Sequence, residues 1–177
     1  MEKSQTLLEA VEIDRILKRM AYEILEKHKG NNVALVGIHT RGVYLARRLR
    51  DNIRAFEETE VLVGEIDITL YRDDWTQLSA QPVVKTTDIP FSVEGKKIIL
   101  VDDVLYTGRT IRAAMDAIID YGRPARIELA VLIDRGHREL PIQSTYTGHC
   151  VRTEPSETVN VMLKECDGED RVVLEKS

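Results

Sequence analysis

Residues 98–110 read Ile98-Ile99-Leu100-Val101-Asp102-Asp103-Val104-Leu105-Tyr106-Thr107-Gly108-Arg109-Thr110. Four aliphatic residues are followed by two carboxylates and then by a loop that contains small and hydroxyl residues. A short, uniformly apolar run is typical of a strand that is buried on both faces of a parallel sheet. The pattern predicts a strand over 98–101 that stops at Asp102, and a helix from about Arg109 to Tyr121.

The residues at the start of this helix suit a phosphate monoester. Thr107–Thr110 offer backbone N–H groups, two hydroxyls, a guanidinium and the positive end of a helix dipole. Asp102 and Asp103 can accept hydrogen bonds from two vicinal sugar hydroxyls. An acidic turn with an N-capping threonine is the alternative, but it does not explain why two carboxylates end an apolar strand or why hydroxyl residues flank Gly108 and Arg109.

The same order of strand, turn and helix occurs upstream. Residues 33–38 form a short apolar run, and residues 39–42 form a polar turn that ends in Gly42. Apolar residues then recur every three or four positions from Val43 to Leu49, which predicts a helix. Arg41 lies at the end of this strand, where it is suited to capture an anion; an ordinary surface arginine is the alternative.

The remaining periodic patterns predict one more helix and several more strands. In chain order they are a helix over 13–25, a strand segment over 61–70, a strand over 127–133, and two late strands over 159–163 and 171–174. The segment 61–70 forms either one strand or two strands joined by a bulge at Gly64. The two late strands are expected to flank a turn at Asp167 and Gly168.

This alternation predicts an α/β fold in a single domain over residues 1–177. The expected architecture is a doubly wound, mostly parallel sheet with helices on both faces. Such sheets bind ligands beyond the carboxyl ends of their strands. Three charged loops are expected at those ends, over 39–42, 102–110 and 134–138, and they are the first candidates for a binding site.

The composition excludes several classes of protein. The 177 residues include 25 Lys and Arg against 30 Asp and Glu, a net charge of −5, and 43 % of them are apolar. These values exclude a disordered chain and a general polyanion-binding surface, although a local basic face is compatible with them. The sequence lacks the motifs of P-loop NTPases, dinucleotide-binding enzymes, zincins and serine hydrolases.

Cysteine usage and hydropathy indicate the compartment. Cys150 and Cys166 have no partner at zinc-ligand spacing and form no disulfide framework, which favours a reducing environment. The first residues form no apolar signal segment, and no apolar run is long enough to span a membrane. We expect a cytoplasmic protein with no membrane partner.

The stretch 98–110 resembles the PRPP-binding signature of the type I phosphoribosyltransferases, where PRPP is 5-phosphoribosyl-1-pyrophosphate. Within that group the chain resembles the PyrR family of pyrimidine operon regulators, from about Ile13 to Glu157. The stretches that carry this closer resemblance lie over 37–42, 64–74 and 134–141. The resemblance implies the type I phosphoribosyltransferase fold, with a small hood contributed by about 134–157.

This resemblance implies a uracil phosphoribosyltransferase, which forms UMP and pyrophosphate from uracil and PRPP. It also implies that PRPP arrives with Mg²⁺, which Asp102 or Asp103 contacts directly or through water, and that the chain forms a dimer or a higher homo-oligomer. Members of the family also bind leader RNA of pyrimidine genes in response to uridine nucleotides. Three functions stay open: catalysis with RNA-binding regulation, uracil salvage alone, or an RNA-binding sensor of PRPP and UMP with little catalysis.

The family's functional residues match positions of this sequence. By resemblance, Asp102 and Asp103 hold the ribose hydroxyls, and Thr107–Thr110 hold the 5′-phosphate. Thr40–Gly42 form the pyrophosphate loop, which often contains a non-proline cis peptide in this fold, and Arg41 joins the two aspartates as an expected catalytic residue. The full set expected to bind PRPP and UMP is Thr40, Arg41, Gly42, Arg72, Asp102, Asp103, Val104, Leu105, Tyr106, Thr107, Gly108, Arg109 and Thr110.

The resemblance also implies functions for two further segments, a closing loop and a hood over the base. Residues 71–88 are polar and lack a period, and they correspond to a loop that closes over PRPP and excludes water; a disordered insertion is the alternative. Asp134, Arg135 and His137 are expected to form the hood over the base. There Arg135 or His137 contacts the carbonyls of uracil. A solvated loop histidine with no role at the base is an equally good interpretation of His137.

The expected RNA face consists of Arg15, Lys18, Arg19, Arg138 and Arg152. Acidic residues on the same opening helix favour an ordinary mixed-charge surface as the alternative. The chain also departs from the family: the segment 148–157, which holds His149, Cys150, Arg152 and Glu154, lacks two of the usual cations. Gln143 also stands where the family commonly has an arginine. Each lost phosphate contact lowers the affinity for RNA, so these departures weigh against RNA regulation.

Overall fold

The computed structural model describes residues 3–29, 31–73 and 85–176. The strands are β1 (Lys3–Glu9), β2 (Val33–Ile38), β3 (Leu62–Ile66), β4 (Lys97–Leu105), β5 (Arg126–Asp134), β6 (Tyr146–Cys150), β7 (Glu157–Met162) and β8 (Arg171–Lys176). The helices are α1 (Ala10–His28), α2 (Arg41–Glu57), α3 (Arg109–Ile119) and α4 (Lys164–Asp167), with a 3₁₀ turn over Thr69–Tyr71. No helix within these described ranges is long and apolar enough to cross a membrane.

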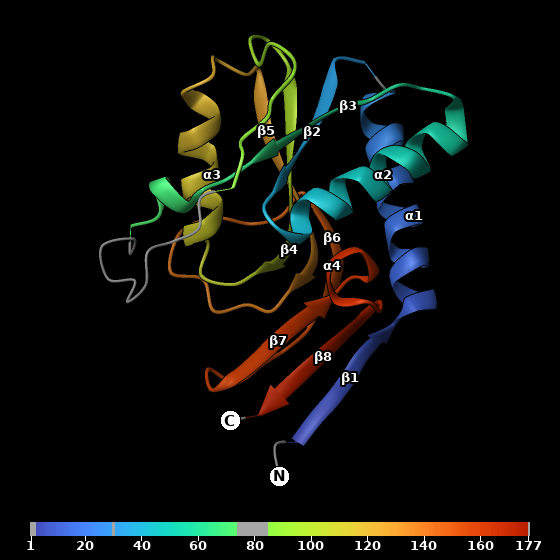
Figure 1. Ribbon diagram of the computed structural model, residues 1–177, viewed down its shortest axis with the longest axis vertical. Coiled ribbons are helices and arrows are strands. Elements are labelled where there is room, and N and C mark those ends of the chain that lie inside the picture. Colours follow the sequence, from blue (N-terminus) through green and yellow to red (C-terminus); the bar gives the residue numbers. More distant parts are fainter. Residues whose placement is uncertain (1–2, 30, 74–84, 177) are drawn as a thin grey trace.

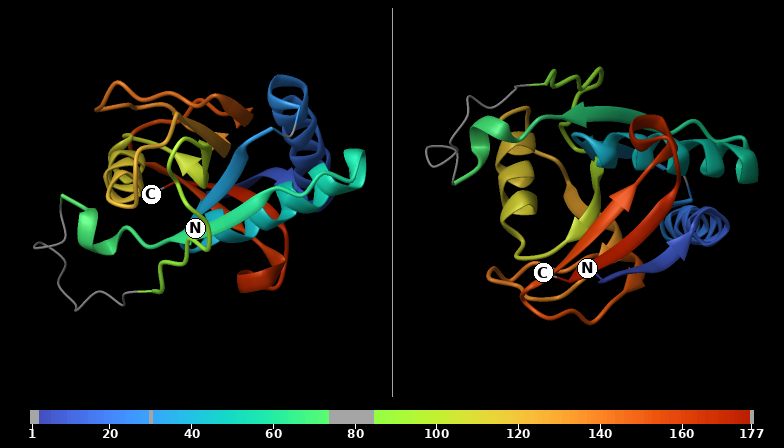
Figure 2. Two further views of the ribbon diagram at one scale, coloured as in Figure 1. Left: turned by 90° about the horizontal axis from the view of Figure 1, so that it is seen from above. Right: turned by 60° about the horizontal axis from the view of Figure 1, so that its bottom comes forward.

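Five parallel strands form the main sheet, in the order β3-β2-β4-β5-β6 (Figure 1). Helices α1 and α2 cover one face of this sheet, and α3 covers the other (Figure 2). The chain places β3 on one side of β2 and β4 on the other side. The strand order therefore reverses between β2 and β4, and the predicted doubly wound α/β fold is confirmed.

Side chains of the central strands alternate between two apolar cores. Leu35 and Ile99 pack in the core beneath α1 and α2. Val36 and Ile98 pack in the core beneath α3. Because both faces of β2 and β4 are buried, neither strand shows the polar alternation of a half-exposed strand, which explains its uniformly apolar sequence.

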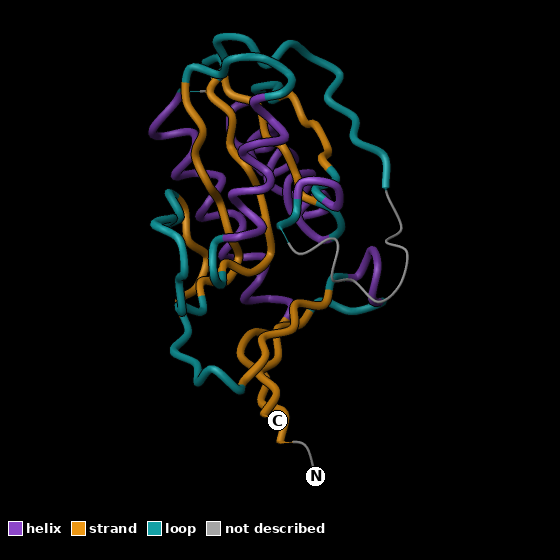
Figure 3. Tube along the Cα trace, turned by 90° about the vertical axis from the view of Figure 1, so that its left-hand side faces the viewer, coloured by secondary structure: helices purple, strands orange, loops and turns teal. Residues whose placement is uncertain are grey.

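Three antiparallel strands, in the order β1-β8-β7, form a second and smaller sheet. This small sheet projects from one end of the main sheet (Figure 3), the end toward which β4 runs (Figure 1). The predicted late strand pair is present as β7 and β8, with α4 at the expected turn, whereas β1 was not predicted. Residues 134–157, the expected hood segment, hold loops and β6, and β6 belongs to the main sheet.

Strand β4 continues through both aspartates to Leu105, so the predicted stop at Asp102 is wrong. Asp102 is paired with Val131 of β5, and Val104 is paired with Ile133. The backbone ladder does not depend on the hydrophobicity of the side chains, and it therefore extends the strand beyond the apolar run.

The segment 61–70 contains one strand, β3, which pairs with β2 in continuous register through Gly64. This strand ends at Ile66, so the prediction of a strand as far as Leu70 is wrong. Asp67 Oδ1 accepts hydrogen bonds from the backbone N–H and the hydroxyl of Thr69, at 2.9 and 2.6 Å. These bonds replace ladder pairing and stabilise the 3₁₀ turn.

Candidate active site

The turn between β2 and α2 packs directly against the end of β4. A Cβ atom on Gly42 would lie 2.3 Å from the carbonyl oxygen of Val101, and one on Gly37 would lie 2.4 Å from the backbone of α2. Distances this short leave room only for glycine at both positions. The close approach brings Arg41, the first residue of α2, to the same end of the sheet as Asp103.

The predicted substrate residues gather around two cavities at this end. The loop Thr40–Arg41, the aspartate pair 102–103, Arg72 and Thr110 line one cavity of about 300 Å³, which we call the central cavity. A neighbouring cavity of about 300 Å³ also includes Arg72 and Thr110, together with residues 106, 107 and 109 of the same loop. Three members of the predicted set line neither cavity: Gly42 packs against Val101, Leu105 is fully buried in the core, and Gly108 is the residue that precedes α3.

The two aspartates have different environments. Asp102 is only 7 % exposed, whereas Asp103 is partly exposed. The Asp103 backbone N–H donates to Asp102 Oδ1 at 2.9 Å, and the Val104 N–H donates to Asp103 Oδ1 at 2.8 Å. Burial raises the pKa of Asp102 well above its usual range, and the adjacent charge of Asp103 raises this pKa further. Asp102 is therefore more easily protonated than an ordinary carboxylate, unless a cation or a hydrogen-bond donor binds beside it.

The loop before α3 presents the start of that helix to the cavities. Gly108 has a φ of 94°, a left-handed conformation that favours glycine. The carbonyl of Thr107 accepts hydrogen bonds from the N–H groups of Glu139 (2.9 Å) and Leu140 (3.2 Å), which hold the loop in place. The Arg109 guanidinium pairs with Asp73 at 2.6 Å and with Glu139 at 3.0 Å. At the start of α3 the Arg109 N–H donates to the Thr107 hydroxyl at 3.3 Å, and the Arg109 guanidinium is engaged with neighbouring carboxylates.

His39 and Thr40 are joined by a cis peptide bond, of the kind that often occurs in this loop of the fold. His39 Nε2 lies 3.0 Å from the carbonyl of Thr86, and Lys85 Nζ donates to the Thr40 hydroxyl. Most of the predicted closing loop, 74–84, lies outside the described residues. Its two described flanks contact the candidate site through Asp73 and Lys85.

Arg41 has a partner that the sequence did not indicate. Its Nη2 donates to Asp167 Oδ1 at 2.8 Å, and its Nε donates to Asp167 Oδ2 at 3.2 Å. These hydrogen bonds raise the pKa of Arg41. A hydrogen bond from the Leu163 N–H, together with Arg41, lowers the pKa of Asp167 to about 2. Asp167 was predicted only as part of a turn, and nothing in its local sequence shows which distant side chain it meets.

Comparisons with known proteins agree with this arrangement. A family model described as the phosphoribosyl transferase domain matches residues 4–164. The chain is 60 % identical to the Bifunctional protein PyrR of Elusimicrobium minutum, over 92 % of each protein. It is 59 % identical to the Bifunctional protein PyrR of Pelotomaculum thermopropionicum, over 98 % of this chain and 96 % of that one. The chain belongs to the PyrR family.

Solved structures similar to this PyrR family member share its fold at low sequence identity. A hypoxanthine-guanine phosphoribosyltransferase from Bacillus anthracis has a TM-score of 0.74 at 19 % identity, with 100 % of both chains covered. The hypoxanthine phosphoribosyltransferase of Trypanosoma cruzi has a TM-score of 0.74 at 20 % identity, over 98 % of this chain and 91 % of that chain. These likenesses confirm the type I phosphoribosyltransferase fold and carry no information about the substrate.

The residues predicted to form the PyrR hood are held by hydrogen bonds to their own loop and to the segment around residues 153–157. Arg135 is 6 % exposed; it donates to the carbonyl of Glu157 at 2.8 Å, and its guanidinium lies 4.0 Å from the centre of the Tyr106 ring. His137 Nε2 lies 2.6 Å from a backbone carbonyl, and Asp134 pairs with Arg138 at 2.6 Å. Asp134, Arg135 and His137 do not line either cavity described above.

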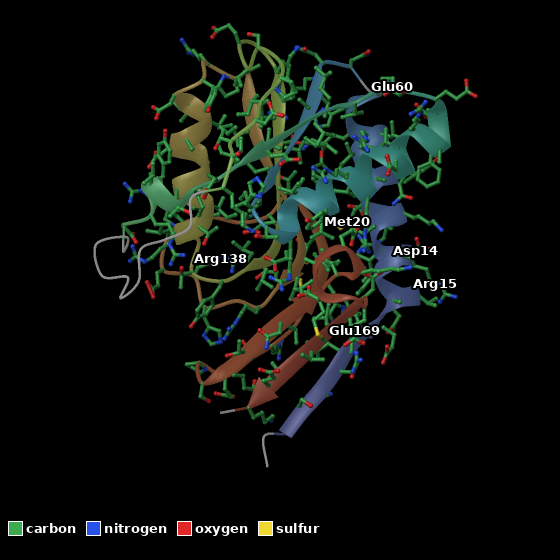
Figure 4. All side chains as sticks on the ribbon, in the orientation of Figure 1. Asp14, Arg15, Met20, Glu60, Arg138 and Glu169 are labelled. Atoms are coloured by element: carbon green, nitrogen blue, oxygen red, sulfur yellow. The ribbon has the colours of Figure 1, made fainter. Side chains whose placement is uncertain are left out.

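The residues predicted for the PyrR RNA face are spread over two regions. Arg15 is exposed on the outer side of α1, beside Asp14 (Figure 4). Lys18 pairs with Asp14 at 2.7 Å, and Arg19 donates to the carbonyl of Gly148 at 2.6 Å, which ties α1 to β6. Arg138 donates to backbone carbonyls of its own loop and of Tyr106, so that side chain supports the loop; Arg152 is exposed.

Proposed function

We propose that this protein transfers the phosphoribosyl group of PRPP to N1 of uracil, forming UMP and pyrophosphate, and that it also regulates pyrimidine genes by binding their leader RNA. One observation carries the catalytic part: the aspartate pair 102–103, the start of α3 and the turn before α2 meet around the central cavity. The relatives named bifunctional, at 59–60 % identity over nearly the whole chain, support the second part. Uracil salvage alone and regulation without catalysis are therefore not favoured.

The geometry supports a separate place for each part of PRPP. The N–H groups at the start of α3 suit the 5′-phosphate, because a helix N-terminus offers unpaired donors and a favourable dipole. The carboxylates of Asp102 and Asp103 suit the two ribose hydroxyls. Thr40 and Arg41 also line the central cavity, where Arg41 supplies positive charge for pyrophosphate.

The reaction displaces pyrophosphate from C1′ of the ribose. The bond from C1′ to the leaving oxygen breaks, and C1′ acquires oxocarbenium character. The bond to N1 of uracil then forms, and the N1 proton passes to the departing pyrophosphate or to water. Negative charge accumulates on the leaving pyrophosphate, so groups that neutralise this charge lower the barrier. Arg41 lines the central cavity and supplies such a positive charge.

The residues at the central cavity fit a Mg²⁺ ion that arrives with PRPP. Mg²⁺ prefers oxygen ligands and commonly keeps waters and substrate phosphates as part of its shell. Asp102 and Asp103 offer two carboxylates beside the cavity, and the described residues contain no group of three or more His, Cys, Asp or Glu suited to a metal. Asp102 or Asp103 would hold the ion, directly or through water. When bound, the ion neutralises charge on the pyrophosphate.

The RNA-binding part is tested by fluorescence anisotropy of a labelled hairpin from a pyrimidine-gene leader. We expect tight binding that UMP strengthens, that a scrambled hairpin does not show, and that falls steeply as salt is added. Weak, equal binding of both hairpins without a response to UMP would leave a salvage enzyme only. The family resemblance also supports assembly into at least a dimer.

One substitution locates the RNA face. We expect Arg15→Gln to weaken hairpin binding and to flatten the salt dependence by roughly one unit of slope, because one phosphate contact is lost. Arg112→Gln is the matched control, since Arg112 is also exposed but lies on α3, on the opposite face of the main sheet. Equal losses of hairpin affinity in both variants would show that the RNA does not bind specifically at Arg15.

A further inference from the structure

We propose that Asp167 is a positioning residue for the transfer reaction, and that its carboxylate fixes the guanidinium plane of Arg41 so that the remaining N–H groups face the pyrophosphate. This inference rests on the proposed function. It assigns a role to a residue of the small-sheet connection, which the sequence resemblance did not include. The inference starts from the double hydrogen bond between Arg41 and Asp167.

The Asp167 carboxylate is itself held firmly. Its Oδ2 accepts a hydrogen bond from the Leu163 N–H at 2.8 Å and lies 3.2 Å from Sγ of Cys166. Asp167 is the last residue of α4, and the left-handed Gly168 follows it at once. A carboxylate fixed in this way gives the guanidinium a defined direction, which a free surface arginine would lack.

Arg41 lies where two cavities meet. It lines the central cavity together with Asp102 and Asp103. It also lines a cavity of about 470 Å³ that reaches along the small sheet past Asn160 and Arg171. A guanidinium has five N–H donors in one plane, and Asp167 uses the Nε edge. The donors on the far edge stay available to a phosphate oxygen in either cavity.

The pair is more than an attachment between the two sheets. The same α4 region is already joined to α2 by Arg48, which donates to Glu165 at 2.8 and 2.5 Å and to Asp170 at 3.0 and 2.7 Å. Arg48 lies seven residues beyond Arg41, which is about two turns of α2 away from the candidate site. Because Arg48 makes this attachment without Asp167, the ion pair between Arg41 and Asp167 is not needed to hold α4 against α2. Its role is to orient Arg41 at the cavity.

The test compares Asp167→Asn with Asp170→Asn in the full-length protein. Both changes remove one carboxylate that pairs with an arginine of α2, but only Asp167 meets Arg41. For Asp167→Asn we expect kcat/KM for PRPP to fall about tenfold, because positioning of a charged donor is lost. We expect KM for uracil to stay within about twofold of the wild-type value, because Arg41 acts on the pyrophosphate side.

A direct binding measurement accompanies the kinetics. Calorimetric titration with Mg-pyrophosphate should show binding to Asp167→Asn that is about tenfold weaker than to the wild type, and Asp167→Glu should recover part of this loss. Asp170→Asn should bind pyrophosphate like the wild type. Thermal unfolding of each variant shows whether it remains folded.

Three results would overturn the inference. They are unchanged pyrophosphate binding in Asp167→Asn, tighter binding in that variant, and an equal loss in Asp167→Asn and Asp170→Asn. Failure of the proposed function is a different result, in which the wild type binds Mg-pyrophosphate but forms no UMP from uracil. In that case the binding comparison still decides the role of Asp167.

Discussion

The carboxylates of Asp102 and Asp103 are consecutive in β4 and both line the central cavity, but their surroundings differ. Asp102 is 7 % exposed. Asp103 is partly exposed and also lines the 470 Å³ cavity with Arg41. One pair of identical residues therefore offers two carboxylates with different exposure at the same end of the sheet.

We expect Asp103→Asn to lower the turnover of UMP formation at least about tenfold. The amide keeps the size of the side chain but loses the negative charge that a ribose hydroxyl or Mg²⁺ would meet. Steady-state assays with saturating PRPP and uracil measure this change. Asp116→Asn on the outer side of α3 is the matched control, since its carboxylate is exposed and pairs with Arg112 at 3.9 Å. Wild-type turnover in Asp103→Asn would show that the carboxylate of Asp103 is not required for UMP formation.

At the scale of elements, the site depends on how closely α2 approaches β4. Gly37 and Gly42 permit backbone contacts that are too close to leave room for a Cβ atom at either position. The other wall is set by the start of α3, which follows β4 after a short loop. Both walls are thus built at the point where the strand order reverses, which is where open α/β sheets bind ligands.

We expect Gly42→Ala to abolish detectable UMP formation and to destabilise the fold by about 1–3 kcal/mol, because the new Cβ forces α2 away from Val101. Gly64→Ala is the control: it lies in β3, where a Cβ would be 3.3 Å from the nearest backbone atom, so we expect a smaller effect. Urea unfolding and UMP assays measure both variants. Normal activity in Gly42→Ala would show that the close approach is not required.

The elements with a strong apolar period were predictable from sequence, and the polar ends of strands were not. The strand over 98–101 was found because its run is uniformly apolar, and the helix that follows was found because its apolar residues recur at helical spacing. Strand β1 (Lys3–Glu9) is largely exposed and polar, and β6 (Tyr146–Cys150) is an edge strand with a mixed sequence. Strand β1 depends on β8 at the other end of the chain, and β6 pairs with β5 through a mixed sequence, so neither strand has a local apolar pattern that reveals it.

At the scale of the whole molecule, a buried ion cluster joins the last turn of α1 to the main sheet. Glu128 of β5 lies 2.8 Å from His28 Nε2, accepts a hydrogen bond from the Tyr146 hydroxyl at 2.7 Å, and pairs with Lys27 at 2.7 Å. Burial disfavours the charge on Glu128, but the hydrogen bonds from these three partners outweigh it and lower the pKa of Glu128 to about 2.

We expect Glu128→Gln to be about 3 kcal/mol less stable than the wild type at neutral pH. The folded-state pKa lies below the unfolded value of about 4.3, so the charged carboxylate stabilises the fold fully above that value. This contribution is lost as the pH falls through about 2. Urea unfolding over the acidic range should show the two proteins converging in stability. A difference that does not change with pH would contradict the expectation.

The assembly of the candidate site was only partly predictable. Its main parts could be predicted, because the carboxyl ends of parallel strands meet at one edge and bring the turn at 39–42 to the aspartates. The contact of Arg41 with Asp167 could not, because it joins the main sheet to the small sheet across the folded molecule. Arg135 was expected to contact uracil, yet it is buried by segments distant in sequence, and its role at the base stays a prediction.

The pairing of the first strand with the last one sets the order in which the molecule can be completed during its synthesis. Lys3 of β1 lies opposite Lys176 of β8, so β1 leaves the ribosome long before its partner exists. Most of the main sheet can form as the chain emerges, whereas the small sheet has to wait for the last residues. Asp167 belongs to that late segment. A nascent chain therefore carries the cavity residues before it carries the carboxylate that directs Arg41.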